Sequence, residues 1–244
     1  MKKVIVVLLV LVALFGFSAC NSDEAADGVF DDDDSGEVAA LDEVSNNPYL
    51  VLVNKDNELP DNWEDKVQID SVENSLGEGM KIEHETYEQF TKLRDALLEQ
   101  GVQIELDSVY RSVDEQQEIW DEWSSDPDFG KEYCKKYLAV PGYSEHHTGL
   151  AVDIFIMKNG EEIRDNDDMI TDKEDFALVH KLMPEYGFIL RYPPERDIIT
   201  GYAYEPWHMR YVGDAKVAKE IMDKDITFEE YLAELKEELT DDAE

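Results

Sequence analysis

The chain has 244 residues, of which 43% are hydrophobic and 10% aromatic, so it can build a core and is not mostly disordered. Its formal net charge is −37, from 22 Lys and Arg against 59 Asp and Glu. This excess of acids excludes nucleic acid as a favoured partner, because phosphate binding needs basic patches, and it excludes adsorption to an anionic surface by charge alone. We interpret the charge as a source of solubility and self-repulsion.

The first twenty residues have the features of a targeting segment. Lys2 and Lys3 precede an apolar run, Val4 to Phe17, that is too short and too N-terminal for an ordinary spanning helix. The run ends in FSAC and resembles a bacterial lipoprotein signal, in which cleavage leaves Cys20 as the lipid-bearing first residue. Phe17 stands where Leu is usual, so a plain signal peptide and an uncleaved anchor remain open. Each alternative places the chain outside the cytoplasm, and the first predicts attachment to the membrane through Cys20 at the bacterial cell surface.

Residues 21–45 are acidic and small and include the run DDDDSGE, so we predict a disordered tether there. The folded domain is expected over residues 46–244. If Cys20 carries lipid, Cys134 is left without a disulfide partner and is interpreted as a buried packing residue. Such a domain depends on its core, and on a metal if one binds.

Hydrophobic spacing and turn residues predict helices and strands without a regular alternation. Ser112 is expected to cap one helix, with Glu115 completing a capping box, and Gly187 to stop another. We predict an α+β fold, a small antiparallel sheet with helices packed on one side. In chain order the expected elements are a strand at 49–54, a helix at 83–100, a strand at 102–110, helices at 112–123 and 130–138, a strand at 150–156, a helix at 173–185, strands at 188–193 and 208–213, and helices at 215–221 and 227–239.

Asp153 is the first indication of a functional site. In the strand from Leu150 to Ile156, one face carries only apolar residues and should pack on the helices, so Asp153 points to the other, open or polar face. An aspartate between apolar neighbours is costly unless it is paired or bound to a cation. In a straight strand His146 would lie about 23 Å from Asp153. The two can share a metal only if the chain turns back between them, and Thr148-Gly149 is a suitable place.

The stretch EPWH supplies Glu205 and His208, which can converge if the chain bends at Pro206. Two histidines and one carboxylate with a fourth position for water form a catalytic zinc arrangement, and a further glutamate fits a general base. An iron oxygenase site uses the same residue types and stays open on spacing alone. His147 should point elsewhere and is given no ligand role.

The stretches SEHHTGLAVD and EPWH fit the S-x-H-x-x-G-x-A-x-D and E-x-W-H patterns of the VanY-type D-alanyl-D-alanine carboxypeptidases and their L,D-carboxypeptidase relatives, the M15 subfamily B zinc peptidases. Four further stretches resemble that family too: LVNKDNELPDNW, VYRS with the following Gln116, PGYSEHHTGLAVDI and YEPWHMRYVG. The resemblance covers residue 46 to the C-terminus.

The resemblance implies a Hedgehog/DD-peptidase-like fold with a zinc site on the open face of the sheet. One zinc per chain would be held by His146, Asp153 and His208, with Glu205 as catalytic base. Substrate contacts are implied for Arg111, Gln116 and Ser144.

A guanidinium can bind a terminal carboxylate bidentately, which agrees with the role implied for Arg111. The alternative to substrate binding by Arg111 is that it pairs with an acid. The alternative for Ser144 is that it serves as a helix cap or a loop hydroxyl.

The expected activity is removal of the C-terminal D-alanine from peptidoglycan stem peptides by a monomeric enzyme. L,D-carboxypeptidase action on tetrapeptides and D,D-dipeptidase action are the alternatives, and the loop from Tyr192 to Tyr204 should shape the pocket that decides. A non-catalytic wall-binding module would be expected to lack Glu205 or a ligand.

Overall fold

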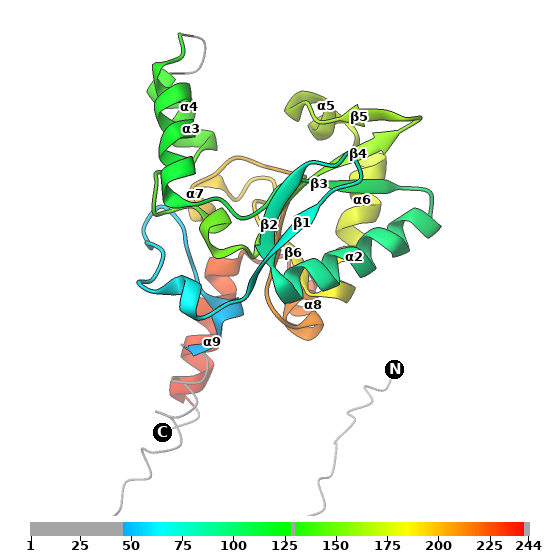
Figure 1. Cartoon of the computed structure of the whole chain (residues 1–244). Coiled ribbons are helices and arrows are strands. Elements are labelled where there is room, and N and C mark those ends of the chain that lie inside the picture. The colour runs from blue at the N-terminus through cyan, green and yellow to red at the C-terminus, as the bar shows by residue number, and fades with distance from the viewer. Residues whose placement is uncertain (1–45, 128–129, 242–244) are drawn as a thin grey trace, which may run out of the picture. The chain divides into compact units, whose positions relative to one another are not determined.

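The structure, a computed structural model, describes residues 46–127 and 130–241 (Figure 1). The helices are α2 (His84–Glu99), α3 (Val113–Ser125), α4 (Gly130–Tyr137), α5 (Asn166–Thr171), α6 (Lys173–Leu182), α7 (Asp197–Thr200), α8 (Ala215–Lys224) and α9 (Phe228–Asp241), with 3₁₀ turns η1 (Pro48–Leu50), η2 (Trp63–Asp65), η3 (Glu145–Thr148) and η4 (Met183–Tyr186). The strands are β1 (Ile69–Glu73), β2 (Gly79–Glu83), β3 (Gln103–Ser108), β4 (Ala151–Lys158), β5 (Glu161–Ile163), β6 (Phe188–Leu190) and β7 (His208–Tyr211).

An antiparallel sheet lies at the centre of the fold. Its strands run in the order β3-β4-β7-β6, and β5 forms a hairpin with the far end of β4. The strands β1 and β2 form a separate antiparallel hairpin. The predicted α+β class with a small antiparallel sheet is therefore confirmed.

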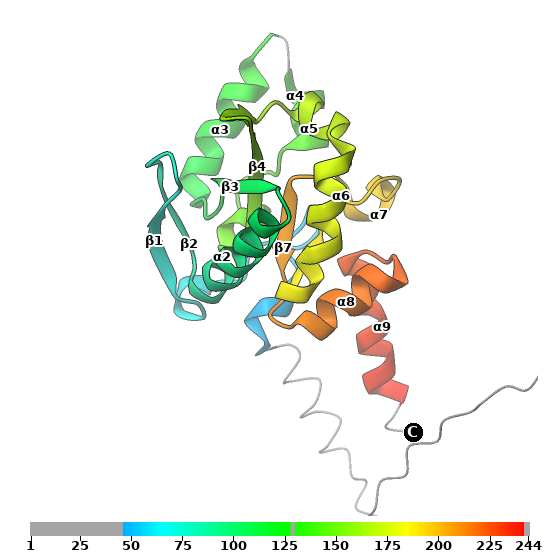
Figure 2. The same ribbon diagram turned by 90° about the vertical axis from the view of Figure 1, so that its right-hand side faces the viewer.

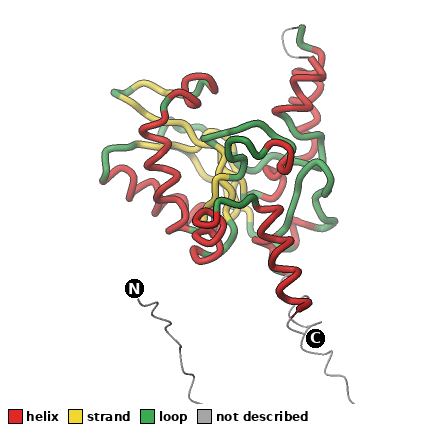
Figure 3. Tube along the Cα trace, turned by 180° about the vertical axis from the view of Figure 1, so that it is seen from behind, coloured by secondary structure: helices red, strands yellow, loops and turns green. Residues whose placement is uncertain are grey.

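The two faces of the sheet are covered differently. Val152, Ile154 and Ile156 of β4 are at most 1% exposed and lie in one core cluster with apolar residues of α2 and α6. Figure 2 shows α2 and α6 along this side, whereas α8 packs against β6 through a second core cluster that contains Ile189, Ala218 and Ile221. Loops gather on the opposite side of the strands in Figure 3. The strand alternation thus leaves Asp153 on the loop side, as predicted.

Local signals placed several helices correctly. The Ser112 side chain accepts from the backbone N–H of Glu115, whose carboxylate accepts from the Ser112 N–H, so the predicted capping box is confirmed. The helix α6 ends at Leu182, before the predicted end, and η4 continues the chain to Gly187, whose φ of +80° suits glycine. Cys134 is fully buried, as expected.

The strand predicted at 49–54 is wrong. The segment begins with η1, which has Pro48 at its start, and continues as extended chain outside the sheet. Its carbonyl groups bond a side chain, because Arg210 Nη2 donates to the carbonyl oxygens of Tyr49 at 3.1 Å and Val51 at 2.8 Å. Apolar β-formers therefore lie here without a partner strand.

The hairpin β1–β2 was not predicted. Most residues of β1 are exposed or half-buried and show no apolar alternation, so the sequence carries a weak strand signal there. The predictions for the signal segment, Cys20 and the tether fall within residues 1–45, outside the described part of the chain. Within that part, every helix is too short or too polar to cross a membrane.

Candidate metal centre

Two of the predicted site residues meet through strand register. The strands β4 and β7 pair antiparallel with Asp153 directly opposite His208. Side chains of such a pair point to the same face of the sheet, with Cβ atoms roughly 4.5–5.5 Å apart. The register alone therefore places a carboxylate beside an imidazole on the loop side.

The third residue, His146, reaches this point because the chain turns back before β4. The turn η3 is capped by Ser144, whose hydroxyl accepts from the His146 N–H at 3.3 Å, and it ends at Gly149 with φ +74°. A Cβ at Gly149 would lie 2.8 Å from Ile69 Cδ1. The predicted reversal at Thr148-Gly149 is confirmed.

The three side chains converge on one point. His146 Nε2 lies 3.2 Å from Asp153 Oδ2, and His208 Nδ1 lies 2.8 Å from Asp153 Oδ1. Their ligand atoms all lie within 4.8 Å of one another, and the two imidazole rings meet edge-on with centroids 5.1 Å apart. Among the described residues, this is the group of histidines, cysteines and acids that can hold a metal ion.

The chemistry of the group suits zinc. His146 Nδ1 donates to the Val109 carbonyl at 2.7 Å, which leaves the Nε2 lone pair free to bind a metal. Asp153 Oδ1 is buried and has no hydrogen-bond partner among the described residues. A carboxylate whose two oxygens each face an imidazole nitrogen, Oδ2 that of His146 and Oδ1 that of His208, is a place for positive charge. Two histidines and one carboxylate are a ligand set of catalytic zinc, so the residues fit this metal.

Burial and neighbouring charges shift the pKa values of the three ligand residues. Burial by itself would raise the pKa of Asp153, but the imidazoles of His146 and His208 outweigh it and hold that pKa well below its usual range. Burial lowers the pKa of His146 and so favours the neutral ring that binds metals. Burial also opposes the charged form of His208, yet the Asp153 carboxylate outweighs burial and raises the pKa of His208 to about 10.

Glu205 lies at the edge of this group. The His208 N–H donates to the Glu205 carbonyl at 3.2 Å, which closes the predicted bend over Pro206. The Glu205 Oε2 atom lies 3.8 Å from His208 Nδ1, and the residue is 7% exposed. Burial raises the pKa of Glu205 to about 8. A carboxylate with a pKa near neutrality can both take and return a proton.

The residues implied in substrate contact line the same cavity as the group. Arg111 donates from Nη1 to Gln116 Oε1 at 2.8 Å and from Nη2 to Ser108 Oγ at 3.0 Å. Gln116 in turn donates to the Ala139 carbonyl at 2.6 Å. No ion pair of Arg111 is found within residues 46–127 and 130–241, so these contacts give no support to the alternative that it pairs with an acid. Ser144 caps η3, as the alternative reading of that residue held.

His147 takes no part in the group. Its Nδ1 donates to the Arg111 carbonyl at 2.6 Å, and its Nε2 accepts from the Gly142 N–H at 3.1 Å. Both ring nitrogens are therefore occupied, and the residue joins the Arg111 segment to the loop before η3.

A cavity of about 280 Å³ opens over the group and is lined by Arg111, Ser144, Tyr192, Tyr202 and Trp207 among others. The loop expected to shape the pocket thus supplies two tyrosines. A larger groove of about 1140 Å³ runs between the β1–β2 hairpin and α3. The two share four residues: Asp107, Ser108, Arg111 and Ile119.

Sequence reasoning missed the charges behind the group, which are Glu145, Arg191 and Arg210. All three are at most 2% exposed. One signal was available, because Arg210 lies inside the predicted strand at 208–213, and an arginine buried in a strand needs an acid. The sequence gives no indication of which of 59 acids fills this role.

Comparison with known proteins places the chain in a family. Residues 79–214 match the family described as VanY: D-alanyl-D-alanine carboxypeptidase. The chain belongs to the VanY family. YodJ of Bacillus subtilis (strain 168) is 40% identical over 191 residues, which are 77% of this chain and 68% of that protein. The chain spans 48% to 68% of the length of the curated relatives it matches.

Two solved structures share the fold. The LdcB LD-carboxypeptidase is 39% identical with a TM-score of 0.65, covering 77% of this chain and 87% of that one. A mutant of the vancomycin resistance D,D-pentapeptidase VanY from the VanB-type resistance cassette, in complex with Zn(II), is 33% identical with a TM-score of 0.62, covering 76% and 99%.

Proposed function

We propose that this VanY-family chain is a zinc-dependent D-alanyl-D-alanine carboxypeptidase that removes the C-terminal D-alanine from peptidoglycan stem peptides. The observation that carries the proposal is the convergence of His146, Asp153 and His208 beside the buried Glu205. The family match and the zinc complex of a VanY relative support the choice of metal and substrate.

The three ligands would hold one zinc ion, which would lower the pKa of a water and polarise the scissile carbonyl. Glu205 takes the proton of the attacking water and returns it to the leaving amine, a task that suits its raised pKa. The enclosed site also strengthens each electrostatic contact with the reacting atoms.

Arg111 binds the terminal carboxylate of the substrate. Two of its N–H groups are held by Gln116 and Ser108, which fixes the guanidinium plane and leaves other donors for the carboxylate. Gln116 acts by orienting Arg111, and Ser144 lines the cavity next to it.

The groove that continues the cavity supports a substrate longer than a dipeptide. A stem peptide can place its last residue in the cavity and the preceding residues in the groove, whereas a free dipeptide would leave the groove unused. This favours carboxypeptidase over D,D-dipeptidase action. L,D-carboxypeptidase action on tetrapeptides is the second candidate, because the LdcB relative is 39% identical.

Purified protein incubated with defined penta- and tetrapeptide stems, with products identified by mass, tests the proposal. We expect the pentapeptide to lose one D-alanine and Glu205→Gln to leave both peptides intact. Loss of the terminal residue from the tetrapeptide alone would assign the L,D activity, and cleavage of neither would reject the proposed reaction.

The protein would act outside the cytoplasm, held to the membrane by lipid on Cys20. The apolar run before FSAC supports this location. A Cys20→Ser variant should appear in the culture medium or as an unprocessed precursor, whereas release of the unmodified protein would reject the anchor.

A further inference from the structure

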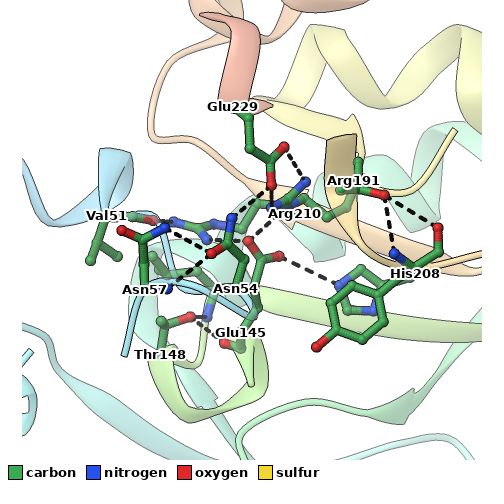
Figure 4. A network of polar contacts seen from close by, with 12 residues as sticks. Val51, Asn54, Asn57, Glu145, Thr148, Arg191, His208, Arg210 and Glu229 are labelled. Carbon is green, nitrogen blue, oxygen red and sulfur yellow. Dashed lines mark hydrogen bonds and ion pairs between the residues drawn. The ribbon is translucent and has the colours of Figure 1, made fainter. Parts of the chain in front are cut away.

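A buried network of charges lies directly behind the metal centre (Figure 4). Glu145 Oε1 accepts from Arg191 Nε at 2.7 Å and from Arg210 Nη1 at 3.0 Å. Both arginines are fully buried, and the Glu145 side chain is 1% exposed. One carboxylate oxygen of Glu145 is thereby shared between two guanidinium groups.

The other oxygen of Glu145 serves neither arginine. Glu145 Oε2 faces His208 Nε2 at 3.6 Å, and Figure 4 shows the two side chains pointing toward each other. Among the described residues neither atom has a hydrogen-bond partner, although both are buried. A buried donor and a buried acceptor at this separation need only a small approach to form a hydrogen bond.

The two nitrogens of His208 face different groups. Nδ1 points to Asp153 and Glu205, at 2.8 and 3.8 Å, and Nε2 points to Glu145. A neutral imidazole can give a lone pair at Nδ1 only if its proton is on Nε2. An ionised carboxylate only accepts hydrogen bonds, so it selects that tautomer.

We propose that Glu145 is a positioning residue that accepts the Nε2–H of His208 and so directs the Nδ1 lone pair toward the metal. The inference rests on the proposed function only in taking His208 as a zinc ligand. Arg191 and Arg210 hold the Glu145 carboxylate in place, because their two donors fix Oε1 and turn Oε2 to the ring.

The same two donors make Glu145→Gln a sharp test. The glutamine amide has nearly the shape of the carboxylate. Its single oxygen would accept the hydrogen bonds of the two arginines, because an arginine can only donate. Its NH₂ group would then face His208 Nε2 and favour the tautomer with the proton on Nδ1. That tautomer has no lone pair for zinc, so the substitution should oppose metal binding.

Glu229 provides a matched control from the same network. Its carboxylate accepts from Arg191 Nη2 at 2.6 Å and from Nη1 at 2.9 Å, and it also accepts from Asn54. No contact between Glu229 and His208 is found among the described residues. Glu229→Gln therefore removes the same charge from Arg191 without touching the ring.

The experiment measures the dissociation constant of zinc for the full chain and both variants by competition with a chelator. We expect Glu145→Gln to weaken zinc binding by about 10- to 100-fold, the usual effect of losing such a partner, and Glu229→Gln to stay within about threefold. An equal loss in both variants would assign Glu145 to fold stability alone, and no loss in Glu145→Gln would reject the inference.

A second measurement does not depend on the variant folding. In zinc-loaded protein with ¹⁵N-labelled histidine, the Nε2–H of His208 should give an NMR signal shifted downfield and protected from exchange with water. A rapidly exchanging Nε2–H would overturn the inference. Neither readout uses a peptide substrate, so a contrast in zinc affinity without stem-peptide cleavage would reject the proposed reaction and leave Glu145 in its role.

Discussion

The surroundings of two carboxylates in one site shift their pKa values in opposite directions. Asp153 lies against two imidazoles and stays ionised, whereas Glu205 is buried with less compensation and its pKa rises to about 8. When the pKa values of two acids in one site differ in this way, one acid stays an anion and the other can exchange protons. The arrangement suits Asp153 to hold a cation and Glu205 to move a proton.

The raised pKa of Glu205 predicts how stability depends on pH in metal-free protein. Its usual value is 4.5, so between about pH 4.5 and 8 the folded state holds a proton that the unfolded state has lost. The stabilisation is complete below pH 4.5 and is lost as the pH rises through 8. Urea unfolding of chelator-treated protein should show stability falling from pH 5 to pH 8 more steeply than in Glu205→Gln. Parallel curves for the two proteins would contradict the assignment.

Glu205→Gln also separates chemistry from metal binding. The amide cannot accept the proton of water, so turnover of a stem peptide should fall by at least about 10²-fold. Zinc content should stay near one per chain, because Glu205 is not among the three grouped ligands. Steady-state rates and elemental analysis on the same preparation check both points, and unchanged turnover would remove Glu205 from the mechanism.

Arg111 should matter only for substrates that carry a terminal carboxylate. Removing one partner of a desolvated charge pair costs at least about 2 kcal/mol, or roughly 30-fold in kcat/KM. We expect that loss for Arg111→Gln on a stem peptide with a free carboxylate, and a much smaller one on its C-terminal amide. Arg94→Gln, at a half-buried residue of α2 that pairs with Asp95 and lines neither the cavity nor the groove, is the control and should leave both rates unchanged. Equal losses on the two peptides would show that Arg111 does not read the carboxylate.

Among the elements, the turn from η3 into β4 sets the geometry of the metal centre. At Gly149 the backbone has φ +74° and an added Cβ would meet Ile69 Cδ1 at 2.8 Å and the Glu83 backbone nitrogen at 3.1 Å. Gly160 has a similar φ of +82° but open space around it. The pair therefore separates backbone strain from steric conflict.

Gly160→Ala should cost about 1 kcal/mol from backbone strain. Gly149→Ala should cost about 1–3 kcal/mol more because of the clash, and it should weaken zinc binding because His146 shifts with the turn. Urea unfolding and zinc titration of both variants check this. Equal destabilisation by the two substitutions would mean that the turn accommodates the added methyl group without moving His146.

Elements with a strong local pattern were predictable, and those that depend on distant side chains were not. The alternation in β4 and the capping box at Ser112 are complete within a dozen residues, so the sequence displays them. The segment 49–54 has strand-like composition, but Arg210, about 160 positions away, bonds its carbonyl groups and no strand pairs with it. A single sequence contains no sign of such a contact.

The candidate site divides in the same way. Its ligand types and the turn at Gly149 follow from the residues, and motif resemblance joined the two halves. The partner of His208 Nε2 did not follow, because Glu145 sits next to a predicted ligand and is separated from Arg191 and Arg210 by 46 and 65 positions. Long-range pairing of buried charges is set by the fold and not by local spacing.

For the whole molecule, the dominant electrostatic property is the net charge of −37. Like charges at the surface repel more strongly in the compact state than in the unfolded chain, so they destabilise the fold. The surface ion pairs act in the other direction, but each contributes at most about 1 kcal/mol and is weakened by salt. The ion pairs of Glu145 with its arginines are buried and therefore screened much less.

Salt should therefore stabilise this protein. Raising NaCl from about 0.01 M to about 1 M shortens the Debye length from roughly 30 to 3 Å and screens the repulsion among surface acids. We expect the thermal midpoint of the zinc-free protein to rise over this range. The same rise with choline chloride would exclude specific binding of sodium. A falling midpoint would mean that surface ion pairs such as Lys158 with Asp172 and Asp175 outweigh the repulsion of the excess acids.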